Sequence, residues 1–135
     1  MSAAQPLHTP PLTVLVDDVR GFRDGRPALV ARSSQEALIL LEDLGNTRID
    51  HLWLDHDLVG EDTIRPVVHW MVQLARTGSS LNVGQIHVHS ANVAGGHWAK
   101  HELEVAGYRV TRNYSLGMRT RQLPPTRASV EGGRR

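Results

Sequence analysis

Cysteine is absent from the 135 residues of this chain, which excludes disulfide bridges, thiolate metal sites and a cysteine nucleophile. No apolar run approaches the roughly 20 residues that a membrane-spanning helix needs. The first eleven residues lack the basic and apolar blocks of a signal peptide. We therefore expect a cytoplasmic protein with no membrane partner. A chain of this length can bury an adequate core unaided, so we expect one domain.

A strong excess of either charge is also lacking, since the formal net charge is +1. The basic residues are nevertheless unevenly placed, because seven arginines and a single acid, Glu131, lie from Arg109 onward. Such a segment can contact a polyanion, although its composition favours a solvated, disordered end. We predict a flexible leader over residues 1–11, a domain over 12–114, and a disordered tail rich in Arg, Pro and Gly over 115–135.

Short apolar runs alternate with segments of helical spacing along the predicted domain. The predicted strands are residues 12–16, 28–31, 51–54, 85–89 and 108–111. Three helices are predicted between them, beginning after Ser33 with the spacing of a capping box, after Asp62 or Thr63, and after Gly95-Gly96. Residues 19–26 are predicted to form a loop or a short, weak helix. The alternation predicts right-handed crossovers and a parallel sheet with flanking helices.

Polar residues follow three of the predicted strands. They are Asp17-Asp18 after the first strand, Asp55-His56-Asp57 after the third, and His89-Ser90-Ala91-Asn92 after the fourth. The carboxyl ends of parallel strands lie along one edge of the sheet, and ligands bind there. A pair of aspartates is common in turns, but three ionisable residues after an apolar strand are unfavourable without a role. We therefore expect one acidic pocket that handles phosphate.

Asp17, Asp18 and Asp55 are the predicted metal ligands. Carboxylates gathered in one place repel one another, and their pKa values rise unless a cation neutralises them. Oxygen ligands with few imidazoles favour Mg²⁺, or Mn²⁺, which can bridge to a substrate phosphate. Ser90 and Asn92 are predicted to hold phosphate oxygens.

Two histidines, His87 and His89, lie on the same face of the fourth predicted strand because side chains alternate along a strand. His89 is nearer the strand end and is predicted to act as a general acid or base. His87 is predicted to be a packed, hydrogen-bonded residue. Asp57 supplies a further proton-transfer group, and His56 is equally compatible with a ligand and with a surface residue.

The motifs carry a resemblance to a known family. Asp17-Asp18, Asp55 and Ser90-Ala91 resemble, in the same order, the acidic pair, phosphoacceptor and switch hydroxyl of response-regulator receiver domains. The longer patterns at residues 54–58 and 88–92 are more similar to a related family, the cyclic-phosphate-processing receiver-like domains. This resemblance implies a flavodoxin-like α/β domain, with a five-stranded parallel sheet of order 2-1-3-4-5 and a magnesium-dependent phosphate site.

The sequence departs from an ordinary receiver domain at its carboxyl-terminal end. No lysine lies at the end of the fifth predicted strand, where the nearest basic residues are Arg109 and Arg112. No amphipathic segment follows Tyr114, so we expect the final helix of receivers to be absent. These departures, together with the additional Asp57, His89 and Asn92, favour hydrolysis over signalling.

We therefore expect a metal-dependent phosphoesterase that acts on a cyclic phosphate, such as the 2′,3′-cyclic phosphate of RNA or of a nucleotide. The predicted catalytic residues are Asp55, Asp57, His89 and Ser90, with Asp55 either a metal ligand or a nucleophile. One alternative is a regulatory receiver that accepts phosphate on Asp55, and another is a non-catalytic nucleotide-binding protein. A haloacid-dehalogenase-like phosphatase is disfavoured because the chain has no late acidic pair. The expected partner is a phosphate-containing small molecule or an RNA end, and the sequence leaves open whether a protein partner exists.

Overall fold

The computed structural model describes residues 11–113 and 118–120. Along the chain the elements are β1 (Thr13–Val16), β2 (Arg20–Phe22), β3 (Leu29–Ala31), α1 (Ser34–Leu44), β4 (Ile49–Leu54), α2 (Arg65–Arg76), β5 (Val83–Val88), α3 (Val93–Val105), β6 (Val110–Arg112) and β7 (Met118–Thr120). The predicted leader, apart from its last residue, and most of the predicted tail lie outside the described residues. In the part of the chain that is described, no helix is long and apolar enough to cross a membrane.

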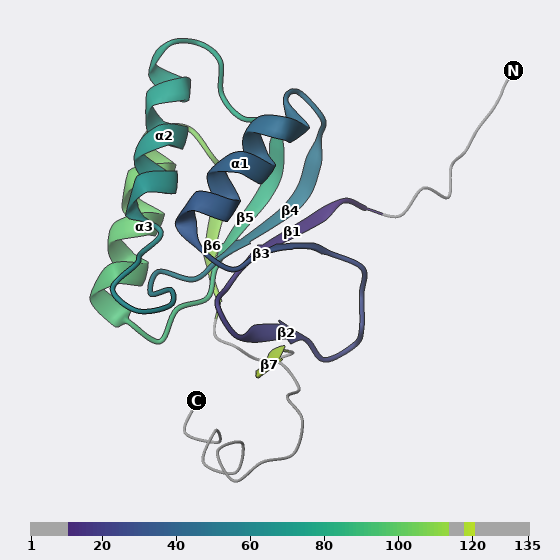
Figure 1. The fold of residues 1–135 in the computed structure, drawn as a ribbon. Coiled ribbons are helices and arrows are strands. Elements are labelled where there is room, and N and C mark those ends of the chain that lie inside the picture. The colour runs from purple at the N-terminus through teal and green to yellow at the C-terminus, as the bar shows by residue number, and fades with distance from the viewer. Residues whose placement is uncertain (1–10, 114–117, 121–135) are drawn as a thin grey trace, which may run out of the picture.

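Five strands form a parallel sheet in the order β3-β1-β4-β5-β6 (Figure 1). Numbered by their own order along the chain, these strands follow the predicted order 2-1-3-4-5. The predicted receiver-like α/β fold is therefore confirmed. After β6 the structure describes only Asn113 and β7, so the prediction that the final helix is absent falls on residues outside the described ones.

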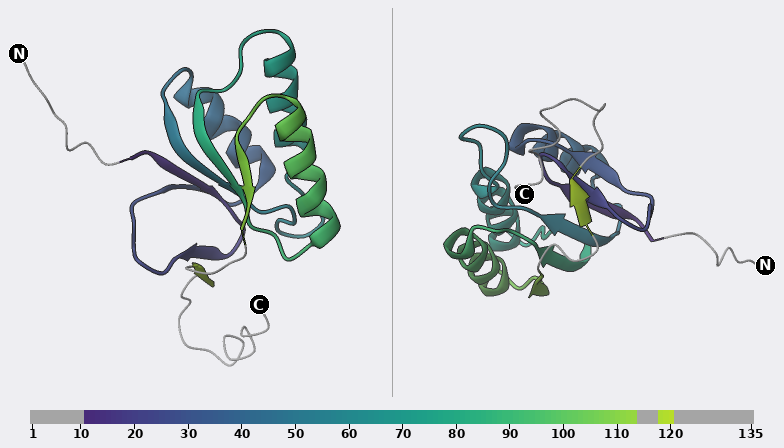
Figure 2. Two further views of the ribbon diagram at one scale, coloured as in Figure 1. Left: turned by 180° about the vertical axis from the view of Figure 1, so that it is seen from behind. Right: turned by 90° about the horizontal axis from the view of Figure 1, so that it is seen from below.

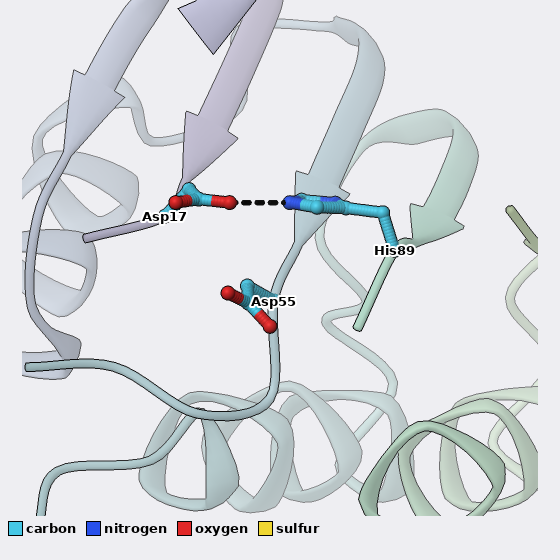
Figure 3. A group of neighbouring side chains, drawn as sticks. All are labelled: Asp17, Asp55 and His89. Atoms are coloured by element: carbon cyan, nitrogen blue, oxygen red, sulfur yellow. Dashed lines mark hydrogen bonds and ion pairs between the residues drawn. The ribbon is translucent and has the colours of Figure 1, made fainter. Parts of the chain in front are cut away.

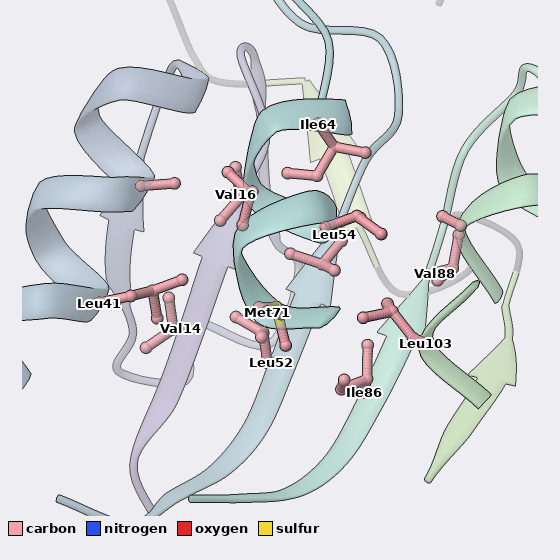
Figure 4. Close-up of a cluster of buried hydrophobic side chains, with 14 of the residues drawn as sticks. Val14, Val16, Leu41, Leu52, Leu54, Ile64, Met71, Ile86, Val88 and Leu103 are labelled. Atoms are coloured by element: carbon pink, nitrogen blue, oxygen red, sulfur yellow. The ribbon is translucent and has the colours of Figure 1, made fainter. Parts of the chain in front are cut away.

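One face of this sheet carries the hydrophobic core. Alternate residues of the three central strands point toward α1, α2 and α3, because successive side chains of a strand lie on opposite faces (Figure 4). The fully buried members of this layer include Val14, Val16, Leu52, Leu54, Ile86 and Val88 from the strands, and Leu41, Met71 and Leu103 from the helices. Burying nine such side chains stabilises the fold by on the order of 1.5–3 kcal/mol each before conformational entropy is counted.

The opposite face, which we call the helix-free face, has no helix packed on it in the described part of the chain (Figure 2). It is partly covered by the segment between β1 and β3. That segment was predicted to be a loop or a weak helix, but it contains β2, which pairs antiparallel with β7. Phe22 explains the difference, because its buried ring packs on Leu15 and edge-on against Trp53, with ring centroids 5.2 Å apart. This contact holds the segment extended across the sheet.

Helix caps agree with the sequence for α1 and differ for α2. Ser33 caps α1 as predicted, accepting a hydrogen bond from the backbone N–H of Glu36 at 3.1 Å. For α2, Ile64 occupies the N-cap position without a side-chain hydrogen bond, and the predicted Thr63, one residue earlier, accepts the backbone N–H of Arg65 at 3.2 Å. Asp62 instead accepts hydrogen bonds from the backbone N–H and the hydroxyl of Ser34, at 2.7 and 2.6 Å. This carboxylate therefore ties the start of α1 to the loop that precedes α2.

Candidate active site at the strand ends

The site is formed by residues that directly follow three neighbouring strands. Asp17, Asp55 and His89 follow β1, β4 and β5, and the pairing registers place them in one row across the sheet. Leu15, Trp53 and His87 are register partners whose side chains point to the helix-free face. Asp17, Asp55 and His89 each lie two residues further along the chain from one of these, so they point to this face as well. In Figure 3 the ring of His89 reaches across toward Asp17, and Asp55 lies beside this pair. The predicted convergence of strand ends therefore occurs, on the side away from the helices.

Asp17 and His89 form a buried pair. The ring Nε2 of His89 donates a hydrogen bond to Oδ2 of Asp17 at 2.9 Å, and neither residue has any exposed surface. The other carboxylate oxygen of Asp17 accepts from the backbone N–H groups of Val19 and Arg20, at 2.9 and 2.7 Å. Burial raises the pKa of Asp17, but these hydrogen bonds, led by that from His89, outweigh it and leave the pKa below its ordinary value. Asp17 is therefore held as a carboxylate.

Asp55 is in the opposite electrostatic situation. It is 8% exposed, and burial together with the nearby charge of Asp17 raises its pKa to about 6, although His89, Arg20 and Ser90 act in the other direction. A carboxylate at this position is destabilised by its surroundings at neutral pH. A bound cation would remove that cost.

These three residues can hold a metal ion, since one ligand atom from each lies within 4.8 Å of the others. The donor set fits a divalent cation. It contains two carboxylates, one of them destabilised by burial, and among the described residues Oδ2 of Asp17 accepts only the hydrogen bond from His89, which leaves it a lone pair for a cation. Asp18, a predicted ligand, is half-buried and is not part of this group. The structure thus brings three of the predicted site residues together, Asp17, Asp55 and His89, and a ligand role for Asp18 stays a prediction.

Ser90 and Asn92 organise the loop between β5 and α3. Ser90 is buried, and its hydroxyl oxygen accepts the backbone N–H of Asn92 at 3.0 Å. The Asn92 side chain caps α3 by accepting the N–H of Gly95 at 2.8 Å, and its amide nitrogen donates to both carboxylate oxygens of Asp57 at 3.1 and 3.2 Å. The predicted phosphate contact from Ser90 stays a prediction. The phosphate contact predicted for Asn92 also stays a prediction.

Asp57 lies apart from the buried pair. Its side chain is 59% exposed and accepts a hydrogen bond from Nδ1 of His56 at 2.7 Å. His56 is buried, with its ring packed against the backbone of α3, where a Cβ on Gly95 would lie 2.5 Å from the imidazole. This places His56 in a packing role, and Asp57 outside the group formed by Asp17, Asp55 and His89.

Two arginines near Asp17 were not anticipated from the sequence. A guanidinium nitrogen of Arg20 lies 3.9 Å from Oδ2 of Asp17, and Arg32 donates to the backbone carbonyls of Asp17 and Arg20 at 3.0 and 2.9 Å. Arg20 could have been noticed as a cation three residues after Asp17. Arg32 lies at the end of another strand, so only the sheet order brings it here. Arg20 supplies positive charge at the mouth of an otherwise acidic site.

Arg112 occupies the end of β6, where receiver domains have a lysine. Its guanidinium donates to the backbone carbonyls of Ser90, Val88 and Asn113, at 2.8, 3.4 and 3.3 Å. A Cβ on Gly96 would lie 2.6 Å from Arg112 Cζ, so this glycine makes room for the guanidinium. Arg112 therefore fixes the loop that carries Ser90.

A family model described as "Cyclic-phosphate processing Receiver domain" matches residues 12–105, more than half of the chain. The chain belongs to this family. No curated protein and no solved structure matches it. The match to the cyclic-phosphate-processing receiver domain begins just before β1 and ends with the last residue of α3, so it contains Asp17, Asp55 and the 89–92 loop. Arg112 and β7 lie beyond the matched segment. The family resemblance predicted from the motifs is confirmed.

Proposed function

We propose that this domain hydrolyses a cyclic phosphate diester, the 2′,3′-cyclic phosphate of an RNA end or a nucleotide, with a divalent cation at Asp17 and Asp55. The observation that carries the proposal is the buried Asp17–His89 pair beside Asp55. Asp55 reaches the surface, whereas the other two residues have no exposed surface. Asp55 is therefore the member of the group that meets the phosphate. The family to which the chain belongs supports this substrate class.

Asp17 and Asp55 would hold the cation through carboxylate oxygens, which favour Mg²⁺ or Mn²⁺. When bound, such a cation neutralises phosphate oxygens and lowers the pKa of a water molecule. Arg20 adds positive charge beside the same oxygens. Ser90, fixed by Asn92 and Arg112, presents its hydroxyl at the neighbouring strand end.

His89 is the proposed proton carrier. Asp17 binds its Nε2–H, and Nδ1 has no hydrogen-bond partner among the described residues. Nδ1 of the neutral ring therefore offers a lone pair. In the proposed step, which requires substrate binding to open a path to the buried ring, the water oxygen bonds to phosphorus and the water proton passes to this nitrogen; the bond from phosphorus to one ribose oxygen breaks, and that oxygen receives the proton. Burial of His89 prevents loss of the proton to bulk solvent.

Cation binding is testable through thermal stability. After chelation, adding Mg²⁺ or Mn²⁺ should raise the melting temperature, since a ligand at 100 times its Kd stabilises a protein by about 2.7 kcal/mol. Asp17→Asn should abolish this rise. Asp18→Asn and His89→Gln should keep it, and Asp43→Asn on the exposed surface of α1 is the matched control. A rise that survives in Asp17→Asn, or that disappears in Asp18→Asn alone, would contradict the ligand assignment.

Hydrolysis is testable with uridine 2′,3′-cyclic phosphate and either cation, followed by phosphorus NMR. We expect opening to a monophosphate by the wild type, and a loss of at least about a hundredfold in His89→Gln, the scale of general acid–base catalysis. Acetyl phosphate should leave no phosphate on Asp55. Stoichiometric phosphate on Asp55 without turnover of the cyclic phosphate would instead identify a regulatory receiver. The engagement of Arg112 with backbone carbonyls disfavours that outcome.

A further inference from the structure

The helix-free face leads directly into the candidate site. Leu15, Trp53, His87 and Thr111 are in register across four strands, and this row lies two residues before the row of Asp17, Asp55 and His89. Two residues along a strand span about 6.6 Å. The rings of Trp53 and His89 have centroids 5.8 Å apart, so the two rows are in contact. A substrate whose phosphate lies at Asp55 would therefore extend over this face.

The row next to the site is aromatic and rigid. Trp53 stacks on His87 with centroids 4.1 Å apart and an interplanar angle of 15°. Both ring nitrogens of His87 have hydrogen-bond partners, His51 at 3.1 Å and Asn113 at 3.2 Å. These contacts fix the imidazole in place before any ligand arrives, which lowers the entropic cost of binding.

Around these rings the face offers hydrogen-bonding groups and the flat surface of an ion-paired guanidinium. His51, Gln85 and Asn113 are half-buried, and Thr111 is exposed. On the opposite side Arg26 lies over the ring of Phe22, 4.4 Å from its centroid. The guanidinium of Arg26 is paired with the carboxylate of Asp24 at 2.7 Å, so the two side chains together add no net charge to the face. A face of this kind is too polar for the core of a dimer interface, and it suits a planar, hydrogen-bonding group attached to an anion.

We propose that the nucleoside attached to the cyclic phosphate lies on the helix-free face, against Trp53 and His87. This inference rests on the proposed function for the position of the phosphate. Nucleic-acid-binding sheets likewise use aromatic side chains and arginine as surfaces for bases. The face would therefore make the domain prefer nucleotide substrates to cyclic phosphates that lack a base.

The test compares ligands with and without a base and needs no hydrolysis. Binding of uridine 3′-monophosphate, ribose 5-phosphate and inorganic phosphate to the full chain should show at least about tenfold tighter binding of the nucleotide. His87→Gln should remove most of that preference and leave the affinity for ribose 5-phosphate unchanged. His101→Gln, the same substitution at an exposed position of α3, is the control and should keep the preference.

A second measurement on the wild type covers the case in which His87→Gln fails to fold. The indole N–H resonance of Trp53, identified by its loss in Trp53→Phe, should shift with the nucleotide and not with inorganic phosphate. Equal affinities for nucleotide and ribose 5-phosphate, or burial of this face in a dimer of the free chain, would overturn the inference. A base preference in a domain that opens no cyclic phosphate would keep the inference and remove the proposed function. Equal turnover of cyclic phosphates with and without a base would support the proposed function and overturn the inference about the nucleoside.

Discussion

Asp55→Asn is expected to abolish hydrolysis of the cyclic phosphate while making the cation-free protein more stable. Activity should be lost because an amide replaces the carboxylate that meets the cation and the phosphate. Stability should rise because burial, together with the charge of Asp17, raises the pKa of Asp55 from 3.8 to about 6. Ionising this group in the folded protein at pH 7 costs about 3 kcal/mol. The neutral amide of the variant removes that cost.

The pH dependence of this gain has a defined direction. Because the folded-state pKa of Asp55 lies above the unfolded value, the folded protein binds the extra proton between these two pKa values, and the wild type loses stability as pH rises through about 6. The free energy of unfolding of Asp55→Asn should therefore exceed that of the wild type most above pH 6, and this difference should shrink toward pH 4. Urea unfolding in the presence of a chelator measures it, with Asp43→Asn as control. An unstable variant, or one whose advantage is independent of pH, would show that Asp55 is not under this electrostatic strain.

Asp17→Asn should have the opposite effect and lower the stability by about 3 kcal/mol or more, the scale of breaking a buried ion pair. The amide cannot accept hydrogen bonds from both Val19 and Arg20 on one atom and also from His89 on the other, because that other atom becomes an N–H donor. A buried donor then faces the His89 Nε2–H. Because the pKa of Asp17 is lower in the folded protein, its carboxylate contributes to the free energy of unfolding above about pH 4. This contribution is lost as the pH falls further.

His89→Gln provides the comparison for Asp17→Asn, because a glutamine amide can still donate to Oδ2 of Asp17. It should unfold at a urea concentration between those of the wild type and Asp17→Asn. If Asp17→Asn unfolds at the wild-type concentration in a chelator, the pair contributes nothing to the fold. Asp17 would then serve the cation alone.

The strand order and the three members of the group, Asp17, Asp55 and His89, could be predicted because they follow from local sequence. Apolar runs that end in Asp17 and Asp55 mark both the strands and the edge where they meet. Which of the two consecutive aspartates, Asp17 or Asp18, lies beside His89 could not be predicted, since it depends on the register between β1 and β5, two strands that are not adjacent. Register decides which of two consecutive aspartates points to the helix-free face, and a shift of one residue reverses the answer.

The loops were harder to predict than the strands. Asp57 lies two residues after Asp55, yet its hydrogen bonds to His56 and Asn92 place it outside the group at Asp17. Asp62 has the sequence signature of a helix cap, but its carboxylate binds Ser34 in another helix. In both cases a tertiary contact takes a side chain whose local pattern allows a different role.

The pairing of β2 with β7 has a consequence for the order of folding. Arg20 and Thr120 are register partners although 100 residues separate them. Forming this pair closes nearly the whole chain into a loop, and strands of three residues return few hydrogen bonds for that loss of chain entropy. The parallel sheet can assemble before this closure. The β2–β7 pair is therefore the last part of the chain to form and the first to open, so its backbone amides should exchange with solvent ahead of those in β4 and β5.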